Sequence, residues 1–85
     1  MVSLAPAQTN SLVSKQQLRA ARALLGWTQR DLGGVLGVDE RQIRFWERRI
    51  PSNPHKRRQI IGAFNAHGVE FIGPPTIGVR HTRYL

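Results

Sequence analysis

The chain has 85 residues, 40% of them hydrophobic, which is enough apolar material for one compact core but not for two. The chain contains 13 lysine and arginine residues but only 5 acidic residues, so its formal net charge is +8. This excess of positive charge favours a polyanionic partner. The absence of cysteine excludes disulfides, thiol nucleophiles and cysteine-ligated zinc, and is compatible with a reducing cytoplasm.

The N-terminal part predicts a flexible tail followed by a helix. Residues 1–13 show no helical or strand period, and they contain neither a basic residue nor the continuous apolar run of a signal peptide or membrane span. A helix is predicted over 15–25, because Ser14 and Gln17 form a capping box and apolar residues then recur at helical spacing as far as Gly26.

Two shorter helices are predicted next. Thr28 and Asp31 form a second capping pattern, and the segment that they open ends at Gly37. Asp39 can cap a third helix over about 39–49, with an acidic residue in its first turn and arginines in its last, the order that the helix dipole favours.

The C-terminal part predicts one further helix and a small β element. Asn53 can cap a helix with Pro54 at its first position, and Gly68 ends it. Residues 69–72 and 79–84 have β-forming composition on either side of a Gly-Pro-Pro-Thr turn, which is typical of a hairpin or a swapped strand.

These elements predict an all-α fold of four to five helices, with a possible short C-terminal β hairpin or strand. The expected organisation is a flexible tail at 1–13, a helix-turn-helix domain at 14–68 and a C-terminal extension at 69–85. The extension is the expected dimerisation element, because its apolar residues are too few for a core of their own: Val69, Phe71, Ile72, Ile77 and Val79.

The stretch 28–47 has the pattern of two short helices crossing over a tight turn. Gly33 leaves room for close crossing of the helices, and Gly37 tolerates the positive φ that the turn requires. The angle between the helices can be filled by Val38, Ile43 and Trp46.

Residues 18–49, with LRAAR at 18–22 and LGWTQ at 25–29, resemble the Cro and repressor family of bacterial and phage regulators, also called the xenobiotic-response-element-type helix-turn-helix. The resemblance implies binding to double-stranded DNA. It also implies that Gln29 holds a DNA phosphate and that Arg22 pairs with Glu47, which ties the first helix to the end of the third.

The third helix has one apolar side and one basic side. At about 100° per residue, Ile43, Trp46, Glu47 and Ile50 share the inner side. In the major groove, arginine can bind guanine through two hydrogen bonds, and phenylalanine can contact a thymine methyl group. The expected base-reading residues are Arg41, Arg44 and Phe45, with Glu40 and Gln42 as second choices.

Positive charge is concentrated over 41–58, where seven basic residues and one acidic residue give a net charge of +6. The start of the fourth helix is expected beside the recognition helix, where cations and backbone amides can hold phosphates. The expected phosphate-binding residues are Thr28, Gln29, Arg48, Arg49, Lys56 and Arg57.

Some residues allow other interpretations. Phe45 and Trp46 depart from the family, which more often has a polar and a smaller aliphatic residue there, so Phe45 is equally a dimer or core contact. Trp27 and Trp46 are expected in packing. The histidines lie 12 and 14 positions apart without an acidic cluster, and no serine stands in a catalytic order, so we expect no metal site, cofactor, small-molecule ligand or catalysis.

The sequence therefore predicts a sequence-specific DNA-binding transcriptional regulator in the bacterial cytoplasm or nucleoid, acting as a homodimer on a two-fold symmetric operator. A protein-binding module, an antitoxin or antiactivator that covers an acidic partner, is the alternative. An RNA-binding domain is less favoured, because the chain lacks the aromatic sheet surface on which single-strand readers stack bases.

Overall fold

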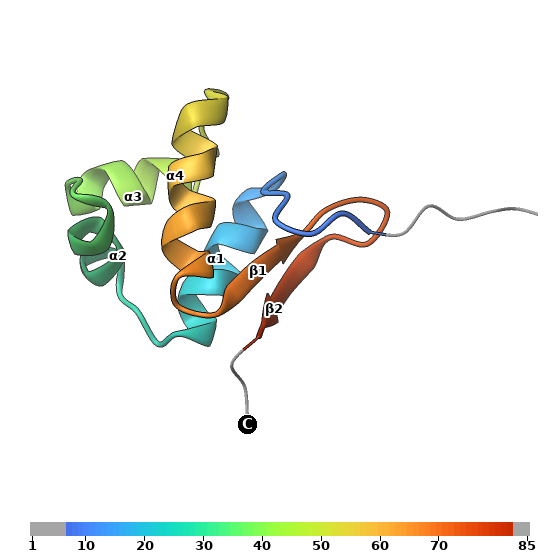
Figure 1. Ribbon diagram of the computed structural model, residues 1–85. Coiled ribbons are helices and arrows are strands. Elements are labelled where there is room, and N and C mark those ends of the chain that lie inside the picture. The colour runs from blue at the N-terminus through green and yellow to red at the C-terminus, as the bar shows by residue number, and fades with distance from the viewer. Residues whose placement is uncertain (1–6, 83–85) are drawn as a thin grey trace, which may run out of the picture.

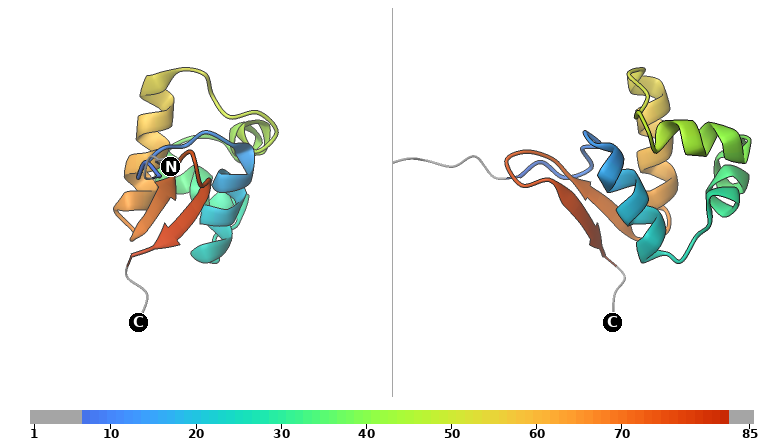
Figure 2. Two further views of the ribbon diagram at one scale, coloured as in Figure 1. Left: turned by 90° about the vertical axis from the view of Figure 1, so that its right-hand side faces the viewer. Right: turned by 180° about the vertical axis from the view of Figure 1, so that it is seen from behind.

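The computed structural model describes residues 7–82, and over this range it has four helices and one antiparallel hairpin (Figure 1). The elements are α1 (Lys15–Leu24), α2 (Gln29–Leu36), α3 (Glu40–Trp46), α4 (Pro54–Asn65), β1 (Val69–Ile72) and β2 (Gly78–His81). The predicted mainly helical fold with a short C-terminal hairpin is confirmed. Helices α2 and α3 lie at one end of the molecule and the hairpin at the other, with α1 and α4 between them (Figures 1 and 2).

The helices begin at the predicted caps, because capping depends on chemistry within one turn of the chain. The Ser14 hydroxyl accepts from the backbone N–H of Gln17 at 3.2 Å, which is half of a complete capping box. In the second box, the Thr28 hydroxyl accepts from the Asp31 N–H at 3.0 Å and the Asp31 carboxylate accepts from the Thr28 N–H at 2.9 Å. The other two helices are capped by Asp39 and Asn53.

Helix α3 ends three residues earlier than the predicted limit of 49. The backbone N–H groups of Arg48 and Arg49 both donate to the Phe45 carbonyl at 3.0 Å, so the helical ladder closes into a turn. Proline at 51 disfavours helical backbone at Ile50, which explains why the helix does not continue. Arg48 and Arg49 therefore lie just beyond the helix.

The hairpin shares one core with the helices. Val69 and Phe71 of β1 are fully buried, and the Phe71 ring meets Phe64 of α4 edge-on, with the ring centres 5.4 Å apart. Trp27 extends this aromatic group, with its ring 5.5 Å from that of Phe64. The extension at 69–85 is thus part of the protomer's own core as far as it is described, and of its apolar side chains Ile77 stays exposed.

The expected flexible tail is wrong for residues 7–13, which pack against β1; residues 1–6 lie outside the described residues. Leu12 is buried, and the backbone N–H of Ser11 donates to the Phe71 carbonyl at 3.0 Å. A further bridge joins Thr9 to Ile72. A segment without a period of its own is ordered here because it covers the edge of β1 and satisfies that strand's backbone groups.

The buried amide of Gln17 links α1 to the N-terminal segment 7–13 and to the hairpin. Its Oε1 accepts from the backbone N–H groups of Val13 at 2.7 Å and Ser14 at 3.0 Å. Its Nε2 shares its protons among three backbone carbonyl oxygens, those of Ser11 at 3.0 Å, Ile72 at 2.8 Å and Gly78 at 3.0 Å.

Candidate nucleic-acid interface

Two glycines set the angle between α2 and α3. Gly37 ends α2 with φ of 70°, a left-handed conformation that is strained for other residues. A Cβ atom on Gly33 would lie 2.7 Å from the Val38 carbonyl oxygen, so the start of the turn passes closer to α2 than any side chain permits. The geometry is that of a helix-turn-helix.

An ion pair fixes α3 to the first helix. Glu47 is buried, and its carboxylate accepts from Arg22 Nε at 2.7 Å and from Nη2 at 3.1 Å. Arg22 Nη1 also donates to the Trp27 carbonyl at 2.8 Å. The pair that the family resemblance implies is therefore present, and it ties α1 to the residue that follows α3.

Gln29, at the start of α2, joins the same group. Its Nε2 donates to Glu47 Oε1 at 3.2 Å, so one of its two amide protons is used within the protein. The side chain remains half-exposed at the N-terminal end of α2. Its position at a helix N-terminus is compatible with the predicted phosphate contact.

The side of α3 opposite the core is exposed and mostly basic. Ile43 is fully buried and Trp46 is 7% exposed, whereas the Phe45 side of the helix faces outward. Phe45 is 56% exposed, so its interpretation as a core contact is wrong. All five expected base-reading residues lie on the exposed surface: Glu40, Arg41, Gln42, Arg44 and Phe45.

Two of these arginines have weak partners within the chain. Arg44 Nη2 lies 3.8 Å from Glu40 Oε2, and Arg41 Nε lies 4.0 Å from Asp39 Oδ2. All four side chains are 46% exposed or more, and exposed pairs of this kind contribute little to stability. Both guanidinium groups can therefore exchange these partners for a ligand at low cost.

The expected phosphate-binding residues are not equally accessible. Thr28, Arg48, Arg49 and Lys56 are exposed. Arg57 is half-buried and its Nε donates to the Pro51 carbonyl at 2.7 Å, so this side chain also holds the loop between α3 and α4. That loop leads to the first turn of α4, which projects beyond α3 (Figures 1 and 2).

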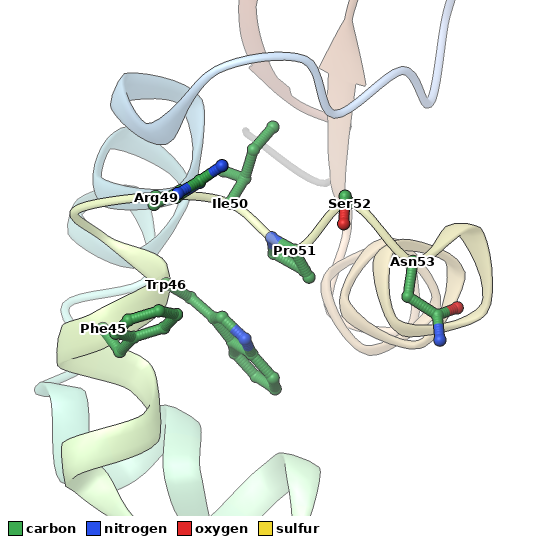
Figure 3. Close-up of a pocket in the computed structure, with 7 residues that line it drawn as sticks. All are labelled: Phe45, Trp46, Arg49, Ile50, Pro51, Ser52 and Asn53. Atoms are coloured by element: carbon green, nitrogen blue, oxygen red, sulfur yellow. The ribbon is translucent and has the colours of Figure 1, made fainter.

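Two open hollows flank Phe45. One, of about 330 Å³, is lined by the end of α3 and by the loop that leads to α4, and Figure 3 shows the Phe45 and Trp46 rings among the side chains that line it. The other, of about 220 Å³, is lined by Phe45 together with Arg41, Arg44 and Arg48. The larger hollow was not predictable from the sequence, because its far wall depends on the path of the loop: Ile50, Pro51, Ser52 and Asn53.

Over residues 7–82, neither a metal-binding cluster nor a membrane-spanning helix is present. His67 packs edge-on against Trp27, with ring centres 4.7 Å apart, and its Nδ1 lies 2.8 Å from the Ala63 carbonyl oxygen. No three potential metal-ligating side chains lie together within this range. None of the helices described is long and apolar enough to span a bilayer.

Comparison with known protein families gives a match to the helix-turn-helix family over residues 18–58. The matched range runs from α1 into α4 and leaves the hairpin outside. Neither the curated proteins nor the solved structures gave a significant match. The matched family consists of DNA-binding transcription regulators of the Cro/repressor type. Residues 18–58 are therefore a Cro/repressor-type helix-turn-helix DNA-binding domain.

Proposed function

We propose that the protein is a sequence-specific transcriptional regulator that reads the major groove of duplex DNA with α3. The observation that carries the proposal is the division of this helix into a buried side, with Ile43 and Trp46, and an exposed side rich in arginine. An α-helix fits the major groove, where each base pair presents a distinct pattern of donors, acceptors and methyl groups.

Each exposed polar side chain on α3 has a chemical match among the base edges. Arg41 and Arg44 can each donate two hydrogen bonds to O6 and N7 of guanine, and Gln42 can bind adenine in a similar way. Glu40 can accept from a cytosine amino group, although in the free protein it lies 3.8 Å from Arg44. A good bidentate contact discriminates against the wrong base by about 1–3 kcal/mol.

Contacts to the DNA backbone would orient α3 in the groove. We assign them to the starts of α2 and α4 and to the turn after α3, where N–H groups and cations are exposed. Each neutralised phosphate should add about 0.9 to the slope of log affinity against log salt concentration. The residues assigned are Thr28, Gln29, Arg48, Arg49, Lys56 and Arg57, the last with the guanidinium nitrogens that Pro51 does not use.

A homodimer on a two-fold symmetric site would supply the specificity that one recognition helix lacks. Helix α3 has 7 residues and can read few base pairs. Two copies with half-sites about 10 base pairs apart would double the length of the sequence that is read. We assign the dimer contact to residues 69–85, of which Ile77 is 52% exposed. A regulator of this kind would act in the bacterial cytoplasm or nucleoid, without a cofactor or catalysis.

The decisive experiment is selection of bound sites from random duplexes at moderate salt, followed by affinity measurements on two variants. Arg44→Ala should relax the base preference at one position of each half-site. Lys56→Ala should weaken binding to all duplexes equally and reduce the salt slope by about 0.9 per protomer. Equal binding of the wild type to selected and scrambled duplexes would refute the proposal, and tight binding of an acidic protein instead would favour an antitoxin or antiactivator.

A further inference from the structure

Phe45 is an apolar side chain at the centre of a basic surface. At 56% exposure it is the most exposed of the large hydrophobic residues among residues 7–82. The others that are exposed, such as Leu24 and Ile77, lie outside α3. Exposing a phenyl ring to water is unfavourable, at about 25 cal/mol per Å² of apolar surface, so this position is suited to an apolar contact in a complex.

The chemistry of the major groove restricts what this ring can recognise. A phenyl group neither donates nor accepts a conventional hydrogen bond, so it cannot read the amino, carbonyl or N7 groups of the bases. The apolar group that the groove presents is the methyl on C5 of thymine. We propose that Phe45 is the residue with which this protein recognises the 5-methyl group of a pyrimidine, a proposal that rests on the DNA-reading role of α3.

The neighbours of Phe45 favour a methyl group that lies close to guanine. Arg41, Arg44 and Arg48 line one hollow together with the phenyl ring, so guanidinium groups surround the apolar contact. Arg41 precedes Phe45 by four residues, about 6 Å along the helix axis. Stacked base pairs are about 3.4 Å apart, so a guanine bound by Arg41 should lie within about two base pairs of the methyl-bearing base.

The contact also predicts a response to base modification. In 5-methylcytosine the methyl group occupies the same C5 position as in thymine, while the base remains paired with guanine. Removal of the methyl by changing thymine to uracil, and its addition by changing cytosine to 5-methylcytosine, should therefore alter the affinity in opposite directions at the same position. Neither change alters the hydrogen-bonding groups of the base.

The test uses the full chain and the duplex that it selects from random sequences. Each thymine is replaced in turn by deoxyuridine, and the dissociation constant is measured at fixed salt. We expect about a fourfold loss at one position of each half-site, the factor that corresponds to about 0.8 kcal/mol for one buried carbon group. A duplex with 5-methylcytosine at that position should bind the protein about fourfold more tightly than the same duplex with cytosine.

Variants then assign the effect to the ring. Phe45→Ala should bring both affinity ratios, uracil against thymine and cytosine against 5-methylcytosine, close to one. Because the side chain is exposed, this variant should fold normally, which circular dichroism can verify. Leu24→Ala, which removes an apolar side chain of 47% exposure from α1, should keep both ratios. A uracil effect that persists in Phe45→Ala, or a selected site indifferent to uracil throughout, overturns this inference but leaves the DNA-reading role intact.

Two further outcomes separate the competing explanations. If Phe45→Ala converts a dimer into a monomer in sedimentation without changing the uracil ratio, the ring is a contact between copies and the inference is wrong. If the wild type binds every duplex equally, the proposed function itself fails, and the methyl contact fails with it.

Discussion

Replacing Glu47 by alanine should cost the protein about 3 kcal/mol of its free energy of unfolding. The Glu47 side chain is 5% exposed and its carboxylate accepts two hydrogen bonds from Arg22 and one from Gln29. Removing one partner of a buried ion pair costs about 3–5 kcal/mol, because the other charge stays buried without compensation. Arg22 keeps 22% exposure and its bond to Trp27, so we expect the lower end of this range.

The loss should be measured by urea denaturation of the free protein, with the melting temperature as a second readout. For a domain of this size, about 3 kcal/mol corresponds to a decrease of roughly 12–24 °C. Glu40→Ala is the matched control, because its pair with Arg44 is exposed, and it should change stability by less than about 1 kcal/mol.

A double-mutant cycle with Arg22→Ala separates the pair from the other contacts of each residue. The coupling free energy should exceed about 1 kcal/mol, since residues in one ion-pair network couple by about 0.5–3 kcal/mol. A coupling near zero, or a loss in Glu47→Ala no larger than in the Glu40 control, would show that the buried pair does not hold α3 to α1.

Three further predictions concern stability. Gly33→Ala should destabilise the protein by about 1–3 kcal/mol, because its Cβ would meet a backbone oxygen. Gly34→Ala has open space around the new Cβ and should stabilise the protein by about 0.5–1 kcal/mol. Urea midpoints that shift in the same direction in both variants would contradict this pair of expectations. Leu12→Ala should cost about 2–5 kcal/mol, and a neutral result would mean that the N-terminal segment is not part of the core. The backbone N–H of Thr28, followed by its side chain, lowers the pKa of Asp31. This carboxylate therefore contributes stability above the pKa of the unfolded chain, which is lost as the pH falls through the lower pKa of the folded state; an NMR titration midpoint at or above the ordinary value would refute the assignment.

The helix starts could be predicted from the sequence because capping is local. Ser14, Thr28, Asp39 and Asn53 each accept from a backbone N–H two or three residues further along the chain, so the signal and the structure lie in one short window. The crossing of α2 and α3 was predictable for a similar reason, because Gly33 is separated from the turn by only a few residues.

Features that depend on distant residues were not predictable in this way. The order of residues 7–13 depends on the edge of β1, and no period within the segment indicates that edge. Gln17 was recognisable as a capping residue, but its bonds to Ile72 and Gly78 join positions 55 and 61 residues away. A polar side chain in a first helical turn carries no sign of such partners.

In the candidate interface too, features set by local helix geometry were predictable, whereas those set by the path of a loop were not. The exposed face of α3 follows from helical geometry, so projection was sufficient to place Arg41, Arg44 and Phe45 on it. The bond from Arg57 to Pro51 depends on how the loop after α3 folds back, and composition alone made Arg57 equivalent to its neighbours. The hollow beside Phe45 has the same origin.

The pairing of residues 7–13 with β1 has a consequence for synthesis on the ribosome. Ser11 and Phe71, whose backbones are hydrogen-bonded, are 60 positions apart. At roughly 5–20 residues per second, the earlier segment waits about 3–12 s for its partner to be translated. Leu12 stays exposed to water and to chaperones for that time, while the helices of the DNA-binding domain can already assemble. Closure of this early-made segment onto β1 is then a late step of folding, so the nascent protein would acquire its recognition surface before it acquires its full stability.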